Sequence, residues 1–209
     1  WLRAQVTAAP RRDNVLRPSE ADAGERRLNN GESDRERKMA LQRGTLVHRL
    51  LQSLPDVAIE RRNDAALRFL VRNAADWSEA ERAMLAAQLL ALVGDARFAH
   101  LFAPGSRAEV AIAGRLGPRK RIVSGRIDRM AVTPSAVWIV DYKTNHAPPR
   151  QATEAPDSYV SQLAQYRAVL AKLYPDRPVR AALLWTESLE MMEISSPALD
   201  AALVTVISP

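Results

Sequence analysis

The sequence predicts an α/β domain, in which a mixed sheet is flanked by helices and preceded by a helical lead-in. Two changes in hydrophobic period predict this class. Residues 44–93 repeat apolar side chains at helical spacing, whereas residues 107–142 are rich in alternating and β-branched positions. Helical spacing returns at residues 158–174, and further strand-like segments follow. Helices, then a strand meander, then helix and strand together are typical of a mixed sheet covered by helices.

The first 42 residues differ from the rest of the chain. Arginine and acidic residues are mixed there without a helical or strand period, and Pro10, Pro18 and Gly31 interrupt them. Such a composition is typical of a linker or an extended arm that is ordered only where it packs on something. We therefore expect residues 1–42 to be an arm with a run-in to the first helix, and residues 43–209 to be the folded domain.

Amphipathic helices are expected next. The first ends before Pro55, and its apolar positions are Leu46, Val47, Leu50, Leu51 and Leu54. Two more helices span residues 65–75 and 78–93. Ser78 and Glu81 form a capping box, which marks the start of the third helix.

Strands and further helices complete the expected order. A meander of strands spans residues 107–113, 121–130 and 136–142. The turn between the last two strands is Thr133-Pro134-Ser135. A helix at residues 158–174, strands at 179–186 and 191–194, and a closing helix at 196–206 follow.

Composition limits the class of protein. The 209 residues suffice for one domain with a core, and the net charge is +6, with a pI of about 10.1. A basic balance suits a polyanion such as nucleic acid, although an arginine-rich composition can also reflect a GC-rich genome. The absence of cysteine excludes disulfides, a cysteine nucleophile and an iron–sulfur cluster bound by this chain. No apolar run reaches the length of a membrane span. Because the chain begins at Trp1, we expect a fragment or a processed product.

A carboxylate and an ammonium follow an apolar strand. Asp141 and Lys143 stand two residues apart, so their side chains point to the same face. One interpretation is a hydrolytic site, in which Asp141 binds a metal and Lys143 positions water and stabilises negative charge. The other is a surface ion pair, which is common and stabilises little.

Asp128 favours the hydrolytic interpretation. It follows another β-branched strand, and a hairpin through the Thr133-Pro134-Ser135 turn brings Asp128 and Asp141 to one end of the sheet. Paired carboxylates repel each other unless a cation lies between them. Hard oxygen ligands with open water positions suit Mg²⁺ or Mn²⁺ better than zinc. Taken alone, Asp128 has the alternative interpretation of a turn residue beside Arg126 or Arg129.

Two helical features are ambiguous when taken singly. A lone histidine such as His48, on the first predicted helix, is more often a core or surface residue than a ligand. Gln162 and Tyr166 are four residues apart on a predicted helix, so they share a face. That face either contacts a DNA backbone or a stacked base, or is an ordinary half-buried helix stripe.

The order of four motifs resembles a known family. The motifs are Gly44-Thr45-Leu46-Val47-His48, Gly125-Arg126-Ile127-Asp128-Arg129, Asp141-Tyr142-Lys143-Thr144, and Gln162 with Tyr166. Their order resembles the RecB-like nucleases of the PD-(D/E)XK superfamily. It is most similar to the carboxyl-terminal nuclease domain of bacterial AddA-type helicase–nucleases, which repair double-strand breaks. The resemblance covers the chain from about Gly44 to Thr186 and implies a restriction-endonuclease-like core.

The resemblance also implies roles for single residues. Metal ligands for Mg²⁺ or Mn²⁺ would be His48, Asp128, Asp141 and the backbone carbonyl of Tyr142. Asp128, Asp141 and Lys143 would be the catalytic residues. Gln162 and Tyr166 would order the site and contact DNA. Glu109, on the first predicted strand, either matches another acidic position of the family or is an exposed strand residue.

A wider role is implied as well. The resemblance implies exonuclease activity on single-stranded or unwound DNA ends, during recombinational repair in the bacterial cytoplasm, with an AddB-type partner subunit and no membrane. The chain lacks a Gly-x-x-x-x-Gly-Lys-[Ser/Thr] loop, so ATP would bind only in motor domains upstream of the arm. The alternatives are a nuclease fold that only binds DNA or a partner, a stand-alone exonuclease, and a structural domain without a nucleic-acid partner.

Overall fold

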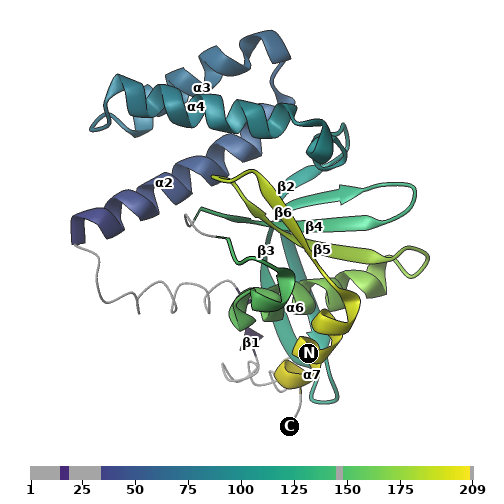
Figure 1. Cartoon of the computed structure of the whole chain (residues 1–209). Coiled ribbons are helices and arrows are strands. Elements are labelled where there is room, and N and C mark those ends of the chain that lie inside the picture. Colours follow the sequence, from purple (N-terminus) through teal and green to yellow (C-terminus); the bar gives the residue numbers. More distant parts are fainter. Residues whose placement is uncertain (1–14, 19–33, 145–147, 208–209) are drawn as a thin grey trace, which may run out of the picture.

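A computed structural model describes residues 15–18, 34–144 and 148–207. Within these residues, a six-stranded mixed sheet lies between two helical layers (Figure 1). Helices α2 to α5 pack on one face of the sheet, and α6 and α7 pack on the other. The predicted α/β class, with a mixed central sheet flanked by helices, is therefore confirmed.

The bounds of the elements agree with most of the predicted segments. In chain order, the elements are β1 (Val15–Leu16), α2 (Asp34–Ser53), η2 (Leu54–Asp56), α3 (Ile59–Asn73), α4 (Glu79–Gly94), η3 (Ala96–Phe98), α5 (Ala99–Phe102), β2 (Arg107–Leu116), β3 (Arg121–Val132), β4 (Val137–Lys143), η4 (Ala152–Glu154), α6 (Asp157–Leu173), β5 (Val179–Trp185), β6 (Glu190–Ile194) and α7 (Ser196–Ile207). The capping box of Ser78 and Glu81 is present at the start of α4, as predicted.

The long strand β3 organises the sheet. Along one edge it pairs antiparallel with β2 over nearly its whole length. Along the other edge it pairs first with β1, which is parallel, at Ile122 and Val123, and later with β4, which is antiparallel, from Arg129 to Val132. Between these two partners, residues 124–128 face no other strand of the described chain on that edge. β5 then pairs parallel with β4, and β6 antiparallel with β5.

The core has one part on each face of the sheet. Alternate residues of β4 point to opposite faces, so that Trp138, Val140 and Tyr142 join the core under α2 to α5. Val137 and Ile139 join the core under α6 and α7. The same alternation directs the side chains of the next odd-numbered positions of β4 toward α6.

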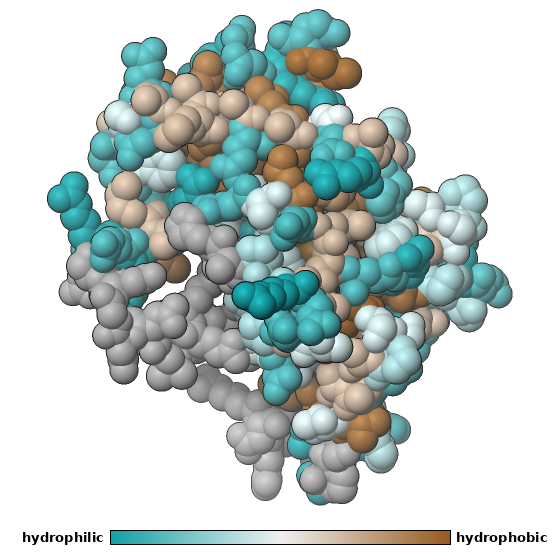
Figure 2. All heavy atoms as spheres, in the orientation of Figure 1, coloured by the Kyte–Doolittle hydropathy of each residue, from teal (hydrophilic) through white to brown (hydrophobic). Residues whose placement is uncertain are grey.

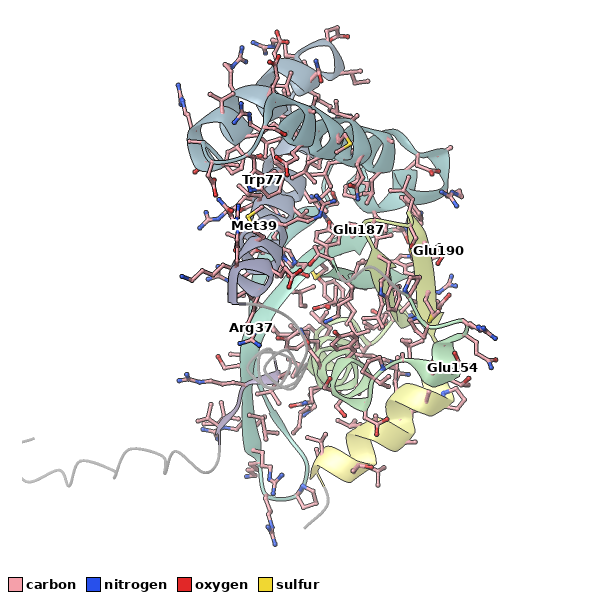
Figure 3. All side chains as sticks on the ribbon, turned by 60° about the vertical axis from the view of Figure 1, so that its left-hand side comes forward. Arg37, Met39, Trp77, Glu154, Glu187 and Glu190 are labelled. Atoms are coloured by element: carbon pink, nitrogen blue, oxygen red, sulfur yellow. The ribbon has the colours of Figure 1, made fainter. Side chains whose placement is uncertain are left out.

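Helix α2 begins at Asp34, well before the expected start at Gly44. Its first turns carry mostly charged, exposed side chains, so an apolar period is weak there. A tertiary contact supports this part of the helix instead, because Trp77 Nε1 donates a hydrogen bond to Gln42 Oε1 at 3.1 Å. Figure 3 shows Trp77 near Met39, which packs on the same core. The predicted division of the chain after residue 42 thus falls inside a continuous helix.

The surface carries no single apolar face in the view of Figure 2, where hydrophobic and hydrophilic side chains are interspersed. Within the described ranges, no single helix is long and apolar enough to cross a membrane. Among the helices that the structure describes, the bent pair formed by α4 and the segment Ala96–Phe102 is long and apolar enough only when its two parts are taken together.

Candidate metal centre

The candidate site lies where β3 and β4 separate. Their antiparallel pairing, which confirms the predicted hairpin, ends at Arg129 and Val140. Asp128 is the next residue of β3, and its Oδ2 accepts a hydrogen bond from the Tyr142 N–H at 2.8 Å. The Asp128 side chain thus accepts the hydrogen bond that a backbone carbonyl of β3 would accept if the strand pairing continued to Tyr142. We call this point, between Asp128 and Tyr142, the β3–β4 fork.

Asp141 and Lys143 form a buried ion pair on one face of β4. Asp141 Oδ2 lies 2.9 Å from Lys143 Nζ, and the lysine side chain is only 1% exposed. The ammonium also lies 3.3 Å from the centre of the Tyr159 ring on α6. Gln162, one turn further along α6, donates from Nε2 to Asp141 Oδ1 at 2.9 Å. The interpretation as an exposed surface pair is therefore wrong, because α6 covers both charged groups.

Three side chains of metal-ligand type converge at the fork from three elements. The ligand atoms of His48 on α2, Glu109 on β2 and Asp128 on β3 all lie within 4.8 Å of one another. His48 Nδ1 lies 3.4 Å from Asp128 Oδ1. Helix α2 passes close to the end of β4, since a Cβ on Gly44 would lie 3.3 Å from Thr144 Oγ1. This close approach brings His48 to the sheet.

His48 lies in a negative electrostatic potential, which three nearby carboxylates produce. Burial lowers the pKa of the imidazole, but the hydrogen bond with Asp128 and the charges of Asp128, Asp141 and Glu109 outweigh burial, so the pKa is raised. The same carboxylates that favour a proton on His48 also favour a divalent cation beside it.

Glu109 has an unusual backbone conformation for a strand residue. Its φ is 54°, in the left-handed region that residues other than glycine rarely adopt. β2 and β3 pair on both sides of it, at Ala108 with Arg129 and at Val110 with Ile127. In this conformation the Glu109 carboxylate lies at the fork, within 4.8 Å of the ligand atoms of His48 and Asp128. Such strain, of roughly 1–3 kcal/mol, is typical of functional sites.

Replacing Glu109 by glycine is expected to give a more stable metal-free protein than replacing it by alanine. Both variants lose the carboxylate, but only glycine relieves the left-handed backbone. That conformation costs alanine roughly 1–2 kcal/mol, and the freedom of glycine in the unfolded chain offsets part of this, so we expect a difference of about 0.5–1 kcal/mol. Urea unfolding in EDTA measures it. Equal free energies of unfolding for the two variants would show that the backbone of Glu109 is not strained.

Gln162 and Tyr166 share a buried face of α6, as the spacing predicted. Gln162 is 4% exposed and holds Asp141, and Tyr166 is 2% exposed and packs on Gly125 of β3. A Cβ on Gly125 would lie 2.2 Å from the Tyr166 phenol oxygen, so only glycine fits there. Gln162 thus contacts Asp141 from within the core, and Tyr166 packs on β3. A role of the two residues in ordering the site, and direct contact of either one with DNA, stay predictions.

A Gly125→Ala substitution is expected to destabilise the protein by about 1–3 kcal/mol, because the new methyl group forces Tyr166 or β3 to move. Gly94→Ala is the matched control, since a Cβ on Gly94, at the end of α4, meets no atom within 4 Å. Thermal unfolding of the two variants measures the effect. Equal stability of both variants would mean that α6 and β3 do not pack as described.

A polar network behind Lys143 was not predicted from the sequence. Arg43 on α2 donates to Glu187 and to Gln88 on α4, in both cases at 2.9 Å. Gln88 donates to the Thr186 carbonyl, and the Thr186 N–H donates to the Lys143 carbonyl at 2.9 Å. Figure 3 shows Glu187 beside α2. These residues are far apart in sequence and form no motif, so no local pattern reveals them. Tyr159 was also missed, although it lies one turn before Gln162 on the same helix face.

The donor set fits a hard divalent cation. The ligand atoms of two carboxylates and one imidazole lie within 4.8 Å of one another, and Asp141 lies on the adjacent strand. A majority of oxygen donors favours Mg²⁺ or Mn²⁺ over zinc. Metal coordination by Asp141 and by the Tyr142 carbonyl stays a prediction, because Gln162 and Lys143 bind the Asp141 carboxylate here.

Comparison with known proteins gives the family. The PD-(D/E)XK nuclease superfamily matches residues 23–205. None of the curated proteins matches this sequence. Similar solved structures include the crystal structure of SSO0001, which is 10% identical with a TM-score of 0.37, over 97% of this chain and 80% of that one. Another is protein VC1899 from Vibrio cholerae, 15% identical with a TM-score of 0.31, over 84% of this chain and 56% of that one. Because the family match spans most of its residues, the chain belongs to the PD-(D/E)XK nuclease superfamily.

Proposed function

We propose that this chain is a metal-dependent deoxyribonuclease domain that hydrolyses phosphodiester bonds at the β3–β4 fork. The observation that carries the proposal is a cluster of three candidate metal ligands where the β3–β4 pairing ends, with a buried aspartate–lysine pair on the neighbouring strand. His48, Glu109 and Asp128 form the cluster, and the Asp141–Lys143 pair lies on the adjacent strand. Membership of a nuclease superfamily supports the same reaction.

The residues of the fork suit distinct steps of hydrolysis. We assign metal binding to His48, Glu109, Asp128, Asp141 and the carbonyl of Tyr142. A bound Mg²⁺ or Mn²⁺ would neutralise phosphate charge and lower the pKa of a bound water. Lys143 holds its ammonium beside Asp141, where it orients the attacking water and stabilises the negative charge that develops on the phosphate. Gln162 keeps the Asp141 carboxylate oriented through its hydrogen bond.

The wider role follows from the order of the motifs. We propose that the domain works in an AddA-type helicase–nuclease of the bacterial cytoplasm, which degrades single-stranded or unwound DNA ends during recombinational repair. Residues 1–42 would connect it to upstream motor domains that bind ATP, and an AddB-type subunit would be its partner. The order of the four motifs, from the Gly44–His48 segment to Gln162 and Tyr166, supports this role.

Digestion of a labelled DNA single strand tests the proposed reaction. The assay compares the wild-type chain with Mg²⁺, the same chain with EDTA, and Asp141→Ala with Mg²⁺. Asp64→Ala is the control, because Asp64 is exposed on α3 and remote from the fork. We expect cleavage by the wild type and by Asp64→Ala, in Mg²⁺ only.

Two results would contradict the proposal. Full activity of Asp141→Ala would show that the fork is not the active site. A wild-type chain that binds the DNA strand and Mg²⁺ but leaves the strand intact would favour the alternative of a nuclease fold that only binds DNA.

A further inference from the structure

Arg129 is a buried arginine next to the candidate ligand Asp128. It is 2% exposed. Within the described residues its guanidinium contacts neutral groups, namely the carbonyl of Leu51, the phenol oxygen of Tyr142 at 3.2 Å, Ser106 Oγ at 3.4 Å and the ring of Phe102. Burial of a cation among neutral acceptors is costly, so each of these contacts contributes to keeping it there.

The bond from Arg129 to Leu51 closes the end of helix α2. In a helix, the Leu51 carbonyl would accept from the N–H four residues further on, but that residue is Pro55, which has none. Arg129 supplies a donor, and its positive charge lies at the negative end of the helix dipole. Leu51 stands one turn after His48, so this bond fixes the turn of α2 that carries His48.

The bond from Arg129 to Tyr142 reaches the other side of the fork. Tyr142 accepts from Arg129 Nε through its phenol oxygen, and donates from its backbone N–H to Asp128 Oδ2. Its ring also packs edge-on against the His48 ring, with 5.6 Å between the ring centres. Burial raises the pKa of Tyr142 to about 12, against the opposing influence of Arg129, so the phenol stays neutral near neutral pH.

We propose that Arg129 is a positioning residue that sets the distance between His48 and Asp128. It holds His48 through the end of α2, and it holds Asp128 through Tyr142, while it touches neither side chain itself. The inference rests on the proposed metal-binding function and adds a residue to it. Loss of a residue that orients metal ligands typically lowers metal affinity about 10–100-fold.

Calorimetric titration of the whole chain with Mn²⁺ tests the role, at a temperature at which each variant is folded. Arg129→Met is expected to bind Mn²⁺ about 10–100-fold more weakly than the wild type. Arg129→Lys keeps the charge and one donor, so we expect a smaller loss. Tyr142→Phe removes only the phenol oxygen that Arg129 binds, so it tests the same link even if Arg129→Met does not fold.

Arg82→Met is the matched control for a general loss of stability. The Arg82 guanidinium also donates to two backbone carbonyls, those of Ala74 and Trp77, but in the helical layer away from the fork. We expect it to lower the unfolding temperature without changing Mn²⁺ affinity.

Two results overturn the positioning role, and they are distinguishable from failure of the proposed function. The role is wrong if Arg129→Met, Arg129→Lys and Tyr142→Phe bind Mn²⁺ as tightly as the wild type. It is also wrong if Arg82→Met weakens binding as much as Arg129→Met does. A wild-type chain that binds no Mn²⁺ would instead refute the metal site of the proposed function, and the positioning role with it.

Discussion

Asp128→Asn is expected to abolish Mn²⁺ binding and to lower DNA cleavage by at least about 100-fold, because a site that cannot hold the ion loses the charge stabilisation that the ion would give the phosphate. Asparagine has the shape of aspartate, and its amide oxygen can still accept the Tyr142 N–H, so the fork keeps its backbone geometry. The substitution removes only the negative charge that Asp128 contributes to the cluster with His48 and Glu109. Calorimetric titration with Mn²⁺ and digestion of a labelled single strand measure the two effects.

Asp200→Asn is the control for this change. Asp200 also forms an ion pair, with Arg167, but it lies on α7 and its side chain is 63% exposed. We expect normal Mn²⁺ binding and cleavage from this variant. An Asp128→Asn protein that cut DNA like the wild type would exclude Asp128 from the active site.

Lys143→Met is expected to lower cleavage by about 100–1,000-fold, the range found when one donor to a developing negative charge is removed. Methionine is apolar and can fill the space under Tyr159 that the lysine stem occupies. The affinity for Mn²⁺ should not fall with the cleavage rate. The Lys143 ammonium binds Asp141 Oδ2, so its removal takes away a cation that competes with the metal ion for this carboxylate and should leave Mn²⁺ affinity unchanged or higher. Single-turnover cleavage rates and Mn²⁺ titration separate the two effects.

Lys172→Met serves as the control, because Lys172 lies in the last turn of α6, away from Tyr159 and Gln162, and donates to the Arg115 carbonyl. A parallel loss of Mn²⁺ affinity and cleavage in Lys143→Met would mean that the lysine supports the structure of the site rather than the reaction. Unchanged cleavage would remove Lys143 from the mechanism.

Local patterns in the sequence were enough to predict the hairpin and the carboxylates beside it. β3 and β4 follow from two β-branched runs around a Thr-Pro-Ser turn, and this turn places Asp128 beside the segment that carries Asp141. The two-residue spacing of Asp141 and Lys143 correctly predicted a shared face. The starts of α2 and α3 were predicted too late, because their first turns are exposed and carry few apolar residues.

The contacts that complete the site depend on tertiary packing. Glu109 reaches the fork only through its left-handed backbone, which no strand pattern predicts. Arg129 is the last residue of the Gly125–Arg129 motif, yet its role depends on Leu51 and on the missing N–H of Pro55, both far away in sequence. The link from Gln88 to Thr186 joins residues on α4 and after β5, which only the folded chain brings together. The hydrophobic period of a single helix or strand cannot predict contacts between residues that are so far apart in sequence.

Location of Mn²⁺ by anomalous diffraction, in crystals of the chain soaked with the ion, tests the central claim most directly. The account predicts one dominant peak at the β3–β4 fork, within ligand distance of Asp128 and His48. The same crystals grown from Asp128→Asn should lack that peak. A peak elsewhere on the molecule, or an equal peak in Asp128→Asn, would contradict the assignment of the fork as the metal centre.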